Sequence, residues 1–286
     1  MIEVKNLTKR YGSHTAVSNL SFHIETGQIY GFLGPNGAGK STTMNIMTGC
    51  LAATEGEVTV GGYDIFEDAA QAKRRIGYLP ERPPLYLDRT PLEYLAFVGQ
   101  AKGLTGSALE EQMRRVMAVT QIESVSNRLI KNLSKGYQQR VGIAQALLGD
   151  PAFLIFDEPT VGLDPEERIH FRNLFSRLAQ DRLVLLSTHI IEDVQSVCSR
   201  LLVLHQGRLR FDGTPEELIR AAEGHVGTFE ARAGGREDGL HITARVNTAR
   251  GVACRAVAET LPPYVRPAEP TLEDAYLYLI SGEGEA

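Results

Sequence analysis

Residues 34–42 read GPNGAGKST and match the phosphate-binding pattern G-x-x-x-x-G-K-[ST] at every fixed position. The apolar residues 28–33 predict a buried strand before this loop, and residues 40–47 have the character of a helix start. In such a strand, loop and helix, backbone N–H groups surround a phosphate and the helix N-terminus faces it. The alternative is an ordinary glycine-rich turn. The full match in this setting predicts a nucleotide phosphate site.

Side chains in and after this loop indicate the chemistry of the site. Lys40 is expected to reach the terminal phosphates, and the Ser41 hydroxyl to bind Mg2+. A second apolar strand, predicted over residues 152–156, ends in Asp157-Glu158, at the edge where open α/β sheets bind ligands. Asp157 is expected to hold Mg2+ through its water shell, and Glu158 to face the water that attacks the γ-phosphate. The alternative is a strand that ends in two solvated acids.

Composition excludes several classes of protein. The chain has 286 residues and a net charge of −5, and it lacks the basic stripe typical of nucleic-acid binding. Its three cysteines, Cys50, Cys198 and Cys254, are widely spaced, which predicts reduced, buried thiols. No leader segment and no apolar run of about 18 residues is present in the sequence. We therefore expect a soluble, cytosolic chain that reaches a membrane only through a partner.

The order of elements predicts the fold class. Apolar strands alternate with helices along most of the chain, which is typical of a parallel sheet covered on both faces. Residues 2–5 and 20–24 alternate as half-buried antiparallel strands do. A helical insert is expected over about residues 82–133, with helix starts at Thr90 and Ser107, each followed three residues later by a glutamate.

A change in composition near residue 223 predicts a domain boundary between residues 1–222 and 223–286. The expected fold is α/β: a P-loop NTPase with a mainly parallel sheet, an antiparallel β subdomain and the helical insert, plus a small C-terminal α+β unit. The elements expected in the C-terminal unit are a glycine-rich charged segment (224–238), a strand (241–246), a helix (249–261) and an amphipathic helix (272–280).

A short stretch upstream of the second apolar strand carries a family resemblance. Residues 133–137 read LSKGY, followed by QQR, at the position where ATP-binding subunits of ABC transporters carry their LSGGQ signature. With the phosphate loop and the acidic strand, this stretch makes residues 1–222 resemble such a subunit. Asp164 is similar to an aspartate of the family's D-loop, and His189 to its switch histidine.

The resemblance implies that the chain binds ATP with Mg2+. The implied ATP-binding residues are Tyr11, as the platform for adenine, and Gly34, Pro35, Asn36, Gly37, Ala38, Gly39, Lys40, Ser41 and Thr42. The implied catalytic residues are Glu158, His189 and Lys40, and the implied metal ligands are Ser41 and Asp157. Structural roles remain as alternatives to these functional ones: Tyr11 as an ordinary loop residue, His189 as a loop cap and Asp164 as a helix N-cap.

The signature residues are implied to act in trans, on the nucleotide of a second copy. They are Ser134, Lys135, Gly136 and Tyr137. Because Ser134 precedes a predicted helix, its hydroxyl and the following N–H groups form a second anion site. Each chain then owns half of two nucleotide pockets, and ATP holds a homodimer together. Phosphoryl transfer depends on positioning, so the separated halves are expected to be nearly inactive.

Two residues depart from the family pattern. Lys135 replaces the first signature glycine and adds a positive charge beside the trans phosphate. Glu81 follows residues 76–80, IGYLP, where the family usually has glutamine. Two roles stay open for Glu81: an oxygen ligand of Mg2+ or of its water, or a solvated loop acid.

Details of the sequence resemble the bacterial ABC-2-type exporter branch, namely IGYLPE at 76–81, LSKGY at 133–137 and PTLEDA at 270–275. The resemblance implies an integral membrane permease as partner, docked near Leu85 and Tyr86, and a place on the inner face of the cell membrane. The alternatives are a soluble ABC ATPase that acts on the ribosome or DNA, and an ATP-binding regulator without turnover. The transported substrate is not encoded in a subunit of this kind.

Overall fold

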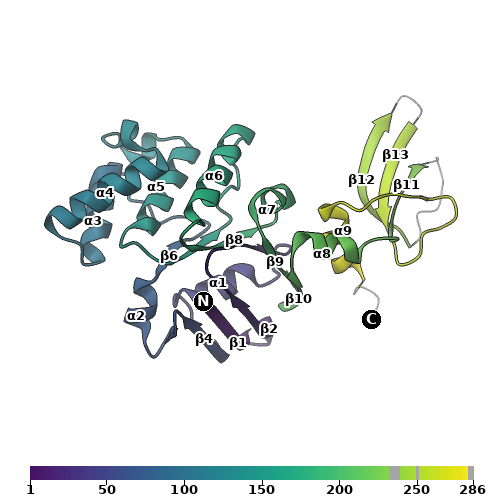
Figure 1. The fold of residues 1–286 in the computed structure, drawn as a ribbon, viewed down its shortest axis with the longest axis horizontal. Helices are drawn as coiled ribbons and strands as arrows, with labels where there is room; N and C mark the ends of the chain where they lie inside the picture. Colours follow the sequence, from purple (N-terminus) through teal and green to yellow (C-terminus); the bar gives the residue numbers. More distant parts are fainter. Residues whose placement is uncertain (232–238, 249–250, 283–286) are drawn as a thin grey trace. The chain divides into compact units, whose positions relative to one another are not determined.

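The computed structural model describes residues 1–231, 239–248 and 251–282. The chain divides into two compact units, Met1–Leu209 and Arg210–Ala286 (Figure 1). The boundary lies before helix α8 (Pro215–Ala221) and not after it, at 209/210 instead of the predicted 222/223. The reason is that α8 packs against α9 (Leu272–Ser281), which belongs to the C-terminal unit.

A six-stranded sheet, in the order β10-β9-β3-β8-β7-β6, has all of its strands in the first unit except β10, which crosses the 209/210 boundary. The strands are β3 (Ile29–Leu33), β6 (Ile76–Leu79), β7 (Phe153–Asp157), β8 (Leu183–Thr188), β9 (Arg200–His205) and β10 (Arg208–Gly213). The pairs β6–β7, β7–β8, β8–β3 and β3–β9 are parallel. Every residue of β3, β7 and β8 is buried. The predicted α/β fold class and its parallel sheet are therefore confirmed.

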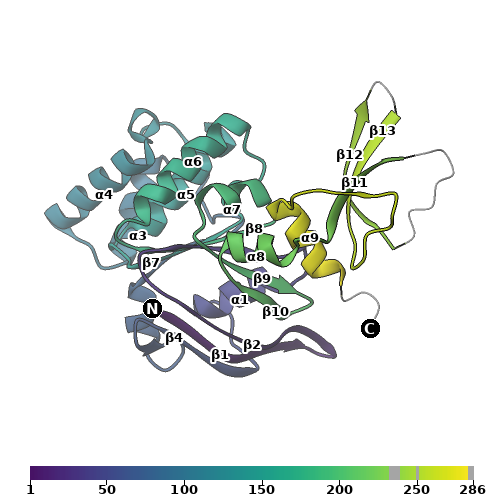
Figure 2. The same cartoon turned by 45° about the vertical axis from the view of Figure 1, so that its right-hand side comes forward.

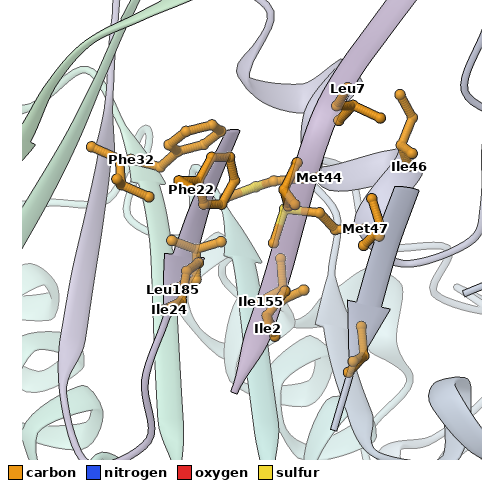
Figure 3. Close-up of a cluster of buried hydrophobic side chains, with 14 of the residues drawn as sticks. Ile2, Leu7, Phe22, Ile24, Phe32, Met44, Ile46, Met47, Ile155 and Leu185 are labelled. Atoms are coloured by element: carbon orange, nitrogen blue, oxygen red, sulfur yellow. The ribbon is translucent and has the colours of Figure 1, made fainter. Parts of the chain in front are cut away.

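A four-stranded antiparallel sheet, ordered β2-β1-β4-β5, faces the parallel sheet across helix α1 (Lys40–Met47) (Figures 1 and 2). Its strands are β1 (Ile2–Tyr11), β2 (His14–Ile24), β4 (Glu55–Val60) and β5 (Tyr63–Asp64). Figure 3 shows Phe22, Phe32, Met44 and Met47 meeting in the core between the sheets, with the two phenylalanine ring centroids 6.0 Å apart. This shared core holds α1, and with it the end of the phosphate loop, in place.

Helices cover the other face of the parallel sheet (Figure 2). They include α5 (Lys135–Leu147), α6 (Pro165–Leu178) and α7 (Ile191–Val197). The insert helices α3 (Pro91–Ala101) and α4 (Gly106–Thr120) pack on α5, and the short α2 (Ala69–Arg74) contacts β5 and β6. The capping box predicted at Thr90 is confirmed: Glu93 N–H donates to Thr90 Oγ1 at 3.2 Å, and Thr90 N–H donates to Glu93 Oε2 at 2.9 Å. The start predicted at Ser107 is wrong, because α4 begins at Gly106 after Thr105, without a side-chain cap.

The C-terminal unit contains a second antiparallel sheet, ordered β12-β13-β11-β14, against which α9 packs. Its strands are β11 (Val226–Ala231), β12 (His241–Thr248), β13 (Gly251–Val257) and β14 (Arg266–Pro267). The helix predicted over 249–261 is wrong: β13 pairs with both β11 and β12, so its backbone groups are satisfied by neighbours distant in sequence. Residues 249–250 of that prediction, and 232–238 of the predicted glycine-rich segment, lie outside the described residues. The final helix is confirmed.

The prediction of buried cysteines holds for Cys198 and Cys254 but is wrong for Cys50, which is exposed. Across the described part of the chain, no helix combines the length and the apolar character needed to cross a bilayer.

Candidate nucleotide site

The phosphate loop connects β3 to α1 and depends on glycine at two close approaches. A Cβ on Gly34 would meet the main-chain carbonyl of Leu204, and a Cβ on Gly39 would meet that of Ala16. Gly39 also has φ 101°, a left-handed conformation that L-residues with a side chain rarely adopt. The loop therefore packs tightly against β9 and β2, with its N–H groups at the start of an eight-residue helix.

Lys40 is buried within the loop, with 6 % of its surface exposed. Its Nζ donates to the carbonyls of Gly34 at 2.7 Å and Pro35 at 3.3 Å. Burial lowers the pKa of Lys40, and the nearby Glu158 carboxylate is the largest influence in the opposite direction. Glu158 Oε1 lies 3.8 Å from Lys40 Nζ. The ammonium thus sits in a low-dielectric site where an anion is strongly favoured.

Glu158 lies in the turn that follows β7. Its φ of 50° is left-handed, and its N–H donates to Ser187 O at 3.0 Å. Its carboxylate, 9 % exposed, lies 3.0 Å from His189 Nδ1 through either oxygen. Because an ionised carboxylate only accepts hydrogen bonds, the proton of this contact sits on Nδ1 of His189. The burial of Glu158 excludes the alternative of a solvated acid at this position.

Asp157 ends β7 and is 2 % exposed, so it is not a solvated acid either. Burial raises the pKa of its carboxyl, partly offset by the nearby hydroxyls of Ser41 and Ser187. Its Oδ1 is buried without a hydrogen-bond partner. A buried carboxylate oxygen with spare acceptor capacity, next to a serine hydroxyl, fits a hard cation such as Mg2+.

Several of the predicted residues line one pocket of about 560 Å3, a volume within the usual range for small-molecule sites. The lining residues are Tyr11, His14, Ala16, Asn36, Gly37, Gly39, Lys40, Ser41, Thr42, Glu81, Glu158, Val161 and His189. Tyr11 ends β1 and is 49 % exposed, with Lys9 Nζ 5.2 Å from its ring centroid. His14, Ala16 and Val161 were not predicted; their closeness in sequence to Tyr11 and Glu158 is the only signal for them.

Gly34, Pro35, Ala38 and Asp157 are not part of this lining. Among the described residues, no three His, Cys, Asp or Glu side chains are grouped to hold a metal ion. A metal held by few protein ligands takes further oxygen ligands from outside the protein. Mg2+ usually takes such ligands from water and substrate phosphates.

The signature residues begin α5 and do not line the pocket. Ser134 is the N-cap, and its Oγ accepts from Tyr137 N–H at 3.4 Å. Gly136 lies against the side chain of Glu167, which a Cβ at residue 136 would meet. Within one chain, this helix start is therefore separate from the phosphate loop.

Lys135 at this helix start lies near the segment that carries Asp164. The Lys135 side chain lies over Gly162, whose φ is 72°. Asp164 caps α6, accepting from Glu167 N–H at 2.9 Å through Oδ1. The capping role of Asp164 is thus confirmed. The D-loop segment and the signature of one chain lie side by side, outside the pocket.

Comparison with known proteins agrees with this geometry. The model of the family described as "ABC transporter" matches residues 17–161. Nod factor export ATP-binding protein I of Cupriavidus metallidurans is 36 % identical over 220 residues, which cover 77 % of this chain and 73 % of that protein. Linearmycin resistance ATP-binding protein LnrL of Bacillus subtilis is 36 % identical over 219 residues, covering 76 % and 70 %.

Among solved structures, the dimeric post-hydrolysis state of the ATP-binding cassette MJ0796, bound to ADP and Pi, superposes with a TM-score of 0.68. Its sequence identity is 27 %, and the match covers 75 % of this chain and 98 % of the cassette.

Proposed function

Because this chain belongs to the ABC transporter family and is an ATP-binding ATPase of that family, we propose that it powers an exporter through a separate membrane subunit. Two relatives support the direction of transport, since their names describe Nod factor export and linearmycin resistance. The same names disfavour a soluble ATPase that acts on the ribosome or DNA. A regulator without turnover is disfavoured by the contact of the buried Glu158 carboxylate with His189.

The observation that carries the proposal is the position of Glu158, between Lys40 and His189 in a pocket lined by the phosphate loop. In this proposal Glu158 accepts the proton of the attacking water, and the buried Lys40 ammonium binds the terminal phosphates. His189, whose Nδ1 is engaged by Glu158, presents Nε2 to the γ-phosphate. These roles use positioning and charge, which dominate the catalysis of phosphoryl transfer.

Asp157 and Ser41 are the proposed protein ligands of Mg2+, directly or through water. The unpartnered Asp157 Oδ1 supports this assignment. When bound, the metal supplies positive charge that neutralises the phosphate oxygens. Glu81 lines the same pocket, and we assign its carboxylate to the outer sphere of the metal, in place of the glutamine amide usual in the family.

The signature residues are proposed to complete the pocket of a second copy. Ser134 through Tyr137 lie apart from the pocket of their own chain, and the similar cassette bound to ADP and Pi is dimeric. Two N–H-rich helix starts, one from each chain, would then enclose each ATP. A preparation held monomeric is expected to lose nearly all turnover, and so is Ser134→Ala within the dimer.

An exposed apolar patch in the helical insert is the proposed contact for the membrane subunit. The patch consists of Tyr86, Leu87, Leu92 and Phe97, which are between 39 % and 51 % exposed. The Tyr86 and Phe97 ring centroids lie 5.3 Å apart. Contiguous exposed apolar groups often mark interaction sites, and we expect a short amphipathic helix of a permease to dock here. This contact would hold the chain on the inner face of the membrane.

Glu158→Gln tests the catalytic part of the proposal. The variant keeps the side-chain volume but removes the base, so kcat should fall by about 10²- to 10⁴-fold while ATP still binds. Light scattering should then detect an ATP-dependent dimer. Wild-type turnover in this variant would rule out Glu158 as the base.

Purification of the chain from detergent-solubilised membranes tests the transport part. The expected partner is a polytopic membrane protein whose association weakens in Tyr86→Ala, with ATP hydrolysis retained. Reconstitution of the pair in vesicles should then give ATP-dependent efflux. Recovery of ribosomes or DNA in place of a membrane protein would instead favour the soluble alternative.

A further inference from the structure

Asp193 is a buried carboxylate to which the nucleotide-site predictions gave no role. It lies on α7 with 5 % of its surface exposed. Its Oδ2 accepts from Thr160 Oγ1 at 2.5 Å, and its Oδ1 accepts from Arg172 Nε at 2.9 Å and Nη2 at 2.6 Å. Both oxygens are thus engaged, and the negative charge is balanced by Arg172. A fully paired ionic group of this kind holds its partners in one arrangement.

The three partners come from segments that flank the proposed catalytic groups. Thr160 lies two residues after Glu158, and Asp193 lies four residues after His189. Arg172 is on α6, the helix that follows the D-loop. A single carboxylate therefore connects the turn that carries Glu158 to the segment that carries His189.

Packing around this connection leaves little room for rearrangement. The cavity beside it, lined in part by Phe175 and Val194, measures about 10 Å3, near the lower limit for one water molecule. Thr160 is 2 % exposed and Val194 is fully buried. Any shift of the Thr160 turn relative to α7 must therefore break one of the Asp193 hydrogen bonds or disturb the core.

The backbone conformation of the Glu158 turn is unfavourable and must be stabilised by its neighbours. Its left-handed φ of 50° is unfavourable for a residue with a side chain. His189 is 46 % exposed in its side chain, so packing on the ring itself does little to orient it. The 3.0 Å contact between Glu158 and His189 depends on two backbone segments that are held at the correct distance.

We propose that Asp193, with Thr160 and Arg172, is a positioning residue that holds Glu158 and His189 in the geometry needed for ATP hydrolysis. The inference rests on the roles proposed above for Glu158 and His189. Asp193 does not line the nucleotide pocket, so it acts through that pair and makes no contact with ATP.

Asp193→Asn is the first test, with Glu192→Gln as its matched control. Glu192 is the adjacent acid on α7 and also faces Arg172, at 3.5 Å, but its side chain is 77 % exposed. In Asp193→Asn, kcat should fall about tenfold, as expected from a small displacement of reacting groups. The dissociation constant for ATP, measured by calorimetry, should change less than twofold. Glu192→Gln should match the wild type in both quantities.

Thr160 supplies a second, milder perturbation, which keeps the inference testable if Asp193→Asn does not fold. Thr160→Val removes the hydroxyl at nearly constant volume and should lower kcat about fivefold, whereas Thr160→Ser should restore most of the activity. Wild-type kcat in both Thr160→Val and Asp193→Asn would overturn the inference. Equal losses of kcat in Thr160→Val and Thr160→Ser would also overturn it, because they would indicate a packing role.

A double variant of the Glu158–His189 pair provides the background that separates positioning from a general loss of structure. If Asp193 acts through the Glu158–His189 pair, then Asp193→Asn in a protein that carries both His189→Ala and Glu158→Gln should lower the residual kcat less than twofold. A full tenfold loss in that background would contradict the inference. If instead Glu158→Gln and His189→Ala both hydrolyse ATP normally, then the proposed catalytic roles themselves are wrong, and the two failures are distinguishable.

Discussion

Replacing Asp274 with asparagine should loosen the C-terminal unit, because this carboxylate is the centre of its polar network. Asp274 is 1 % exposed. It accepts from Thr243 Oγ1 at 2.7 Å, Arg255 Nε at 2.8 Å, Thr271 N–H at 2.8 Å and Thr271 Oγ1 at 2.7 Å. Burial alone would raise the pKa of this carboxyl, but the hydrogen bonds from Arg255 and the two threonines hold it below its ordinary value.

The magnitude follows from these contacts. Asparagine can keep an oxygen toward Arg255 and Thr271, so the main change is from a charged to a neutral acceptor. A hydrogen bond to a charged group is worth about 1 kcal/mol more than a neutral one. With two or three bonds weakened and Arg255 left without its counter-ion, the C-terminal unit should lose about 2–4 kcal/mol of unfolding free energy. The partial exposure of Arg255, 25 % of its side chain, keeps the loss below that for a fully buried pair.

Amide hydrogen exchange measured by mass spectrometry is the suitable assay, since it resolves the two units within the intact chain. Peptides from β13 and α9 should exchange roughly 30- to 900-fold faster at neutral pH, the ratio that corresponds to 2–4 kcal/mol. Peptides from β3 are the internal reference. Glu273→Gln, which changes the exposed neighbour on the same helix turn, should alter exchange by less than about 0.5 kcal/mol.

The pH dependence provides the check on the electrostatic argument. The pKa of folded Asp274 lies below its unfolded value, so its contribution to stability is complete above the unfolded pKa of about 3.9 and is lost as the pH falls through the folded pKa. The difference between Asp274→Asn and the wild type should therefore shrink below about pH 4. A difference under about 1 kcal/mol at neutral pH, or one that persists unchanged at low pH, would refute the reasoning.

Three further perturbations test other parts of the structure. Asp157→Asn removes a buried carboxylate with an unpartnered oxygen, so in EDTA the free energy of unfolding in urea should stay the same or rise by about 1 kcal/mol. Calorimetry should find that Mg2+ no longer tightens ATP binding to this variant. A large loss of stability in EDTA would contradict this. Leu185→Ala empties a fully buried site in the core shown in Figure 3. It should lower the unfolding free energy of the first unit, measured by urea titration, by about 3–5 kcal/mol. A change below about 1 kcal/mol would show that the neighbouring side chains fill the cavity. Thr90→Ala removes the capping box of α3 and should lower the free energy of local opening at the start of α3 by about 1 kcal/mol. The first α3 amides should therefore exchange faster, while ATP hydrolysis stays unchanged as the control.

Motifs made of neighbouring residues were predicted correctly from the sequence. The phosphate loop, the start of α1 and the N-caps at Thr90 and Asp164 all depend on backbone conformations within a few residues. The glycines of the loop and the oxygens of the caps specify those conformations directly. The buried strands were likewise visible as short apolar runs, as for β3 and β7. Local chemistry therefore identified the family.

Predictions that depended on distant partners were less successful. Residues 251–257 were assigned to a helix, but pairing with β11 and β12 makes them a strand. The boundary between the two units lies at 209/210 and not at 222/223, because α8 packs on α9, about fifty residues later in the chain. The sequence predicted no role for Asp193, because only folding brings Thr160 and Arg172 to its two oxygens.

Residue order alone was enough to identify a nucleotide phosphate site and to place the chain among ABC transporter ATPases, because the loop glycines, Lys40 and the acidic strand end are encoded within short segments. Which acids are buried, which side chains line the pocket and how Glu158 meets His189 came from the packed chain. The physical reason is the sequence separation of the interacting residues. Backbone geometry is set by adjacent residues, whereas burial and charge pairing arise from contacts between segments that only the folded core brings together.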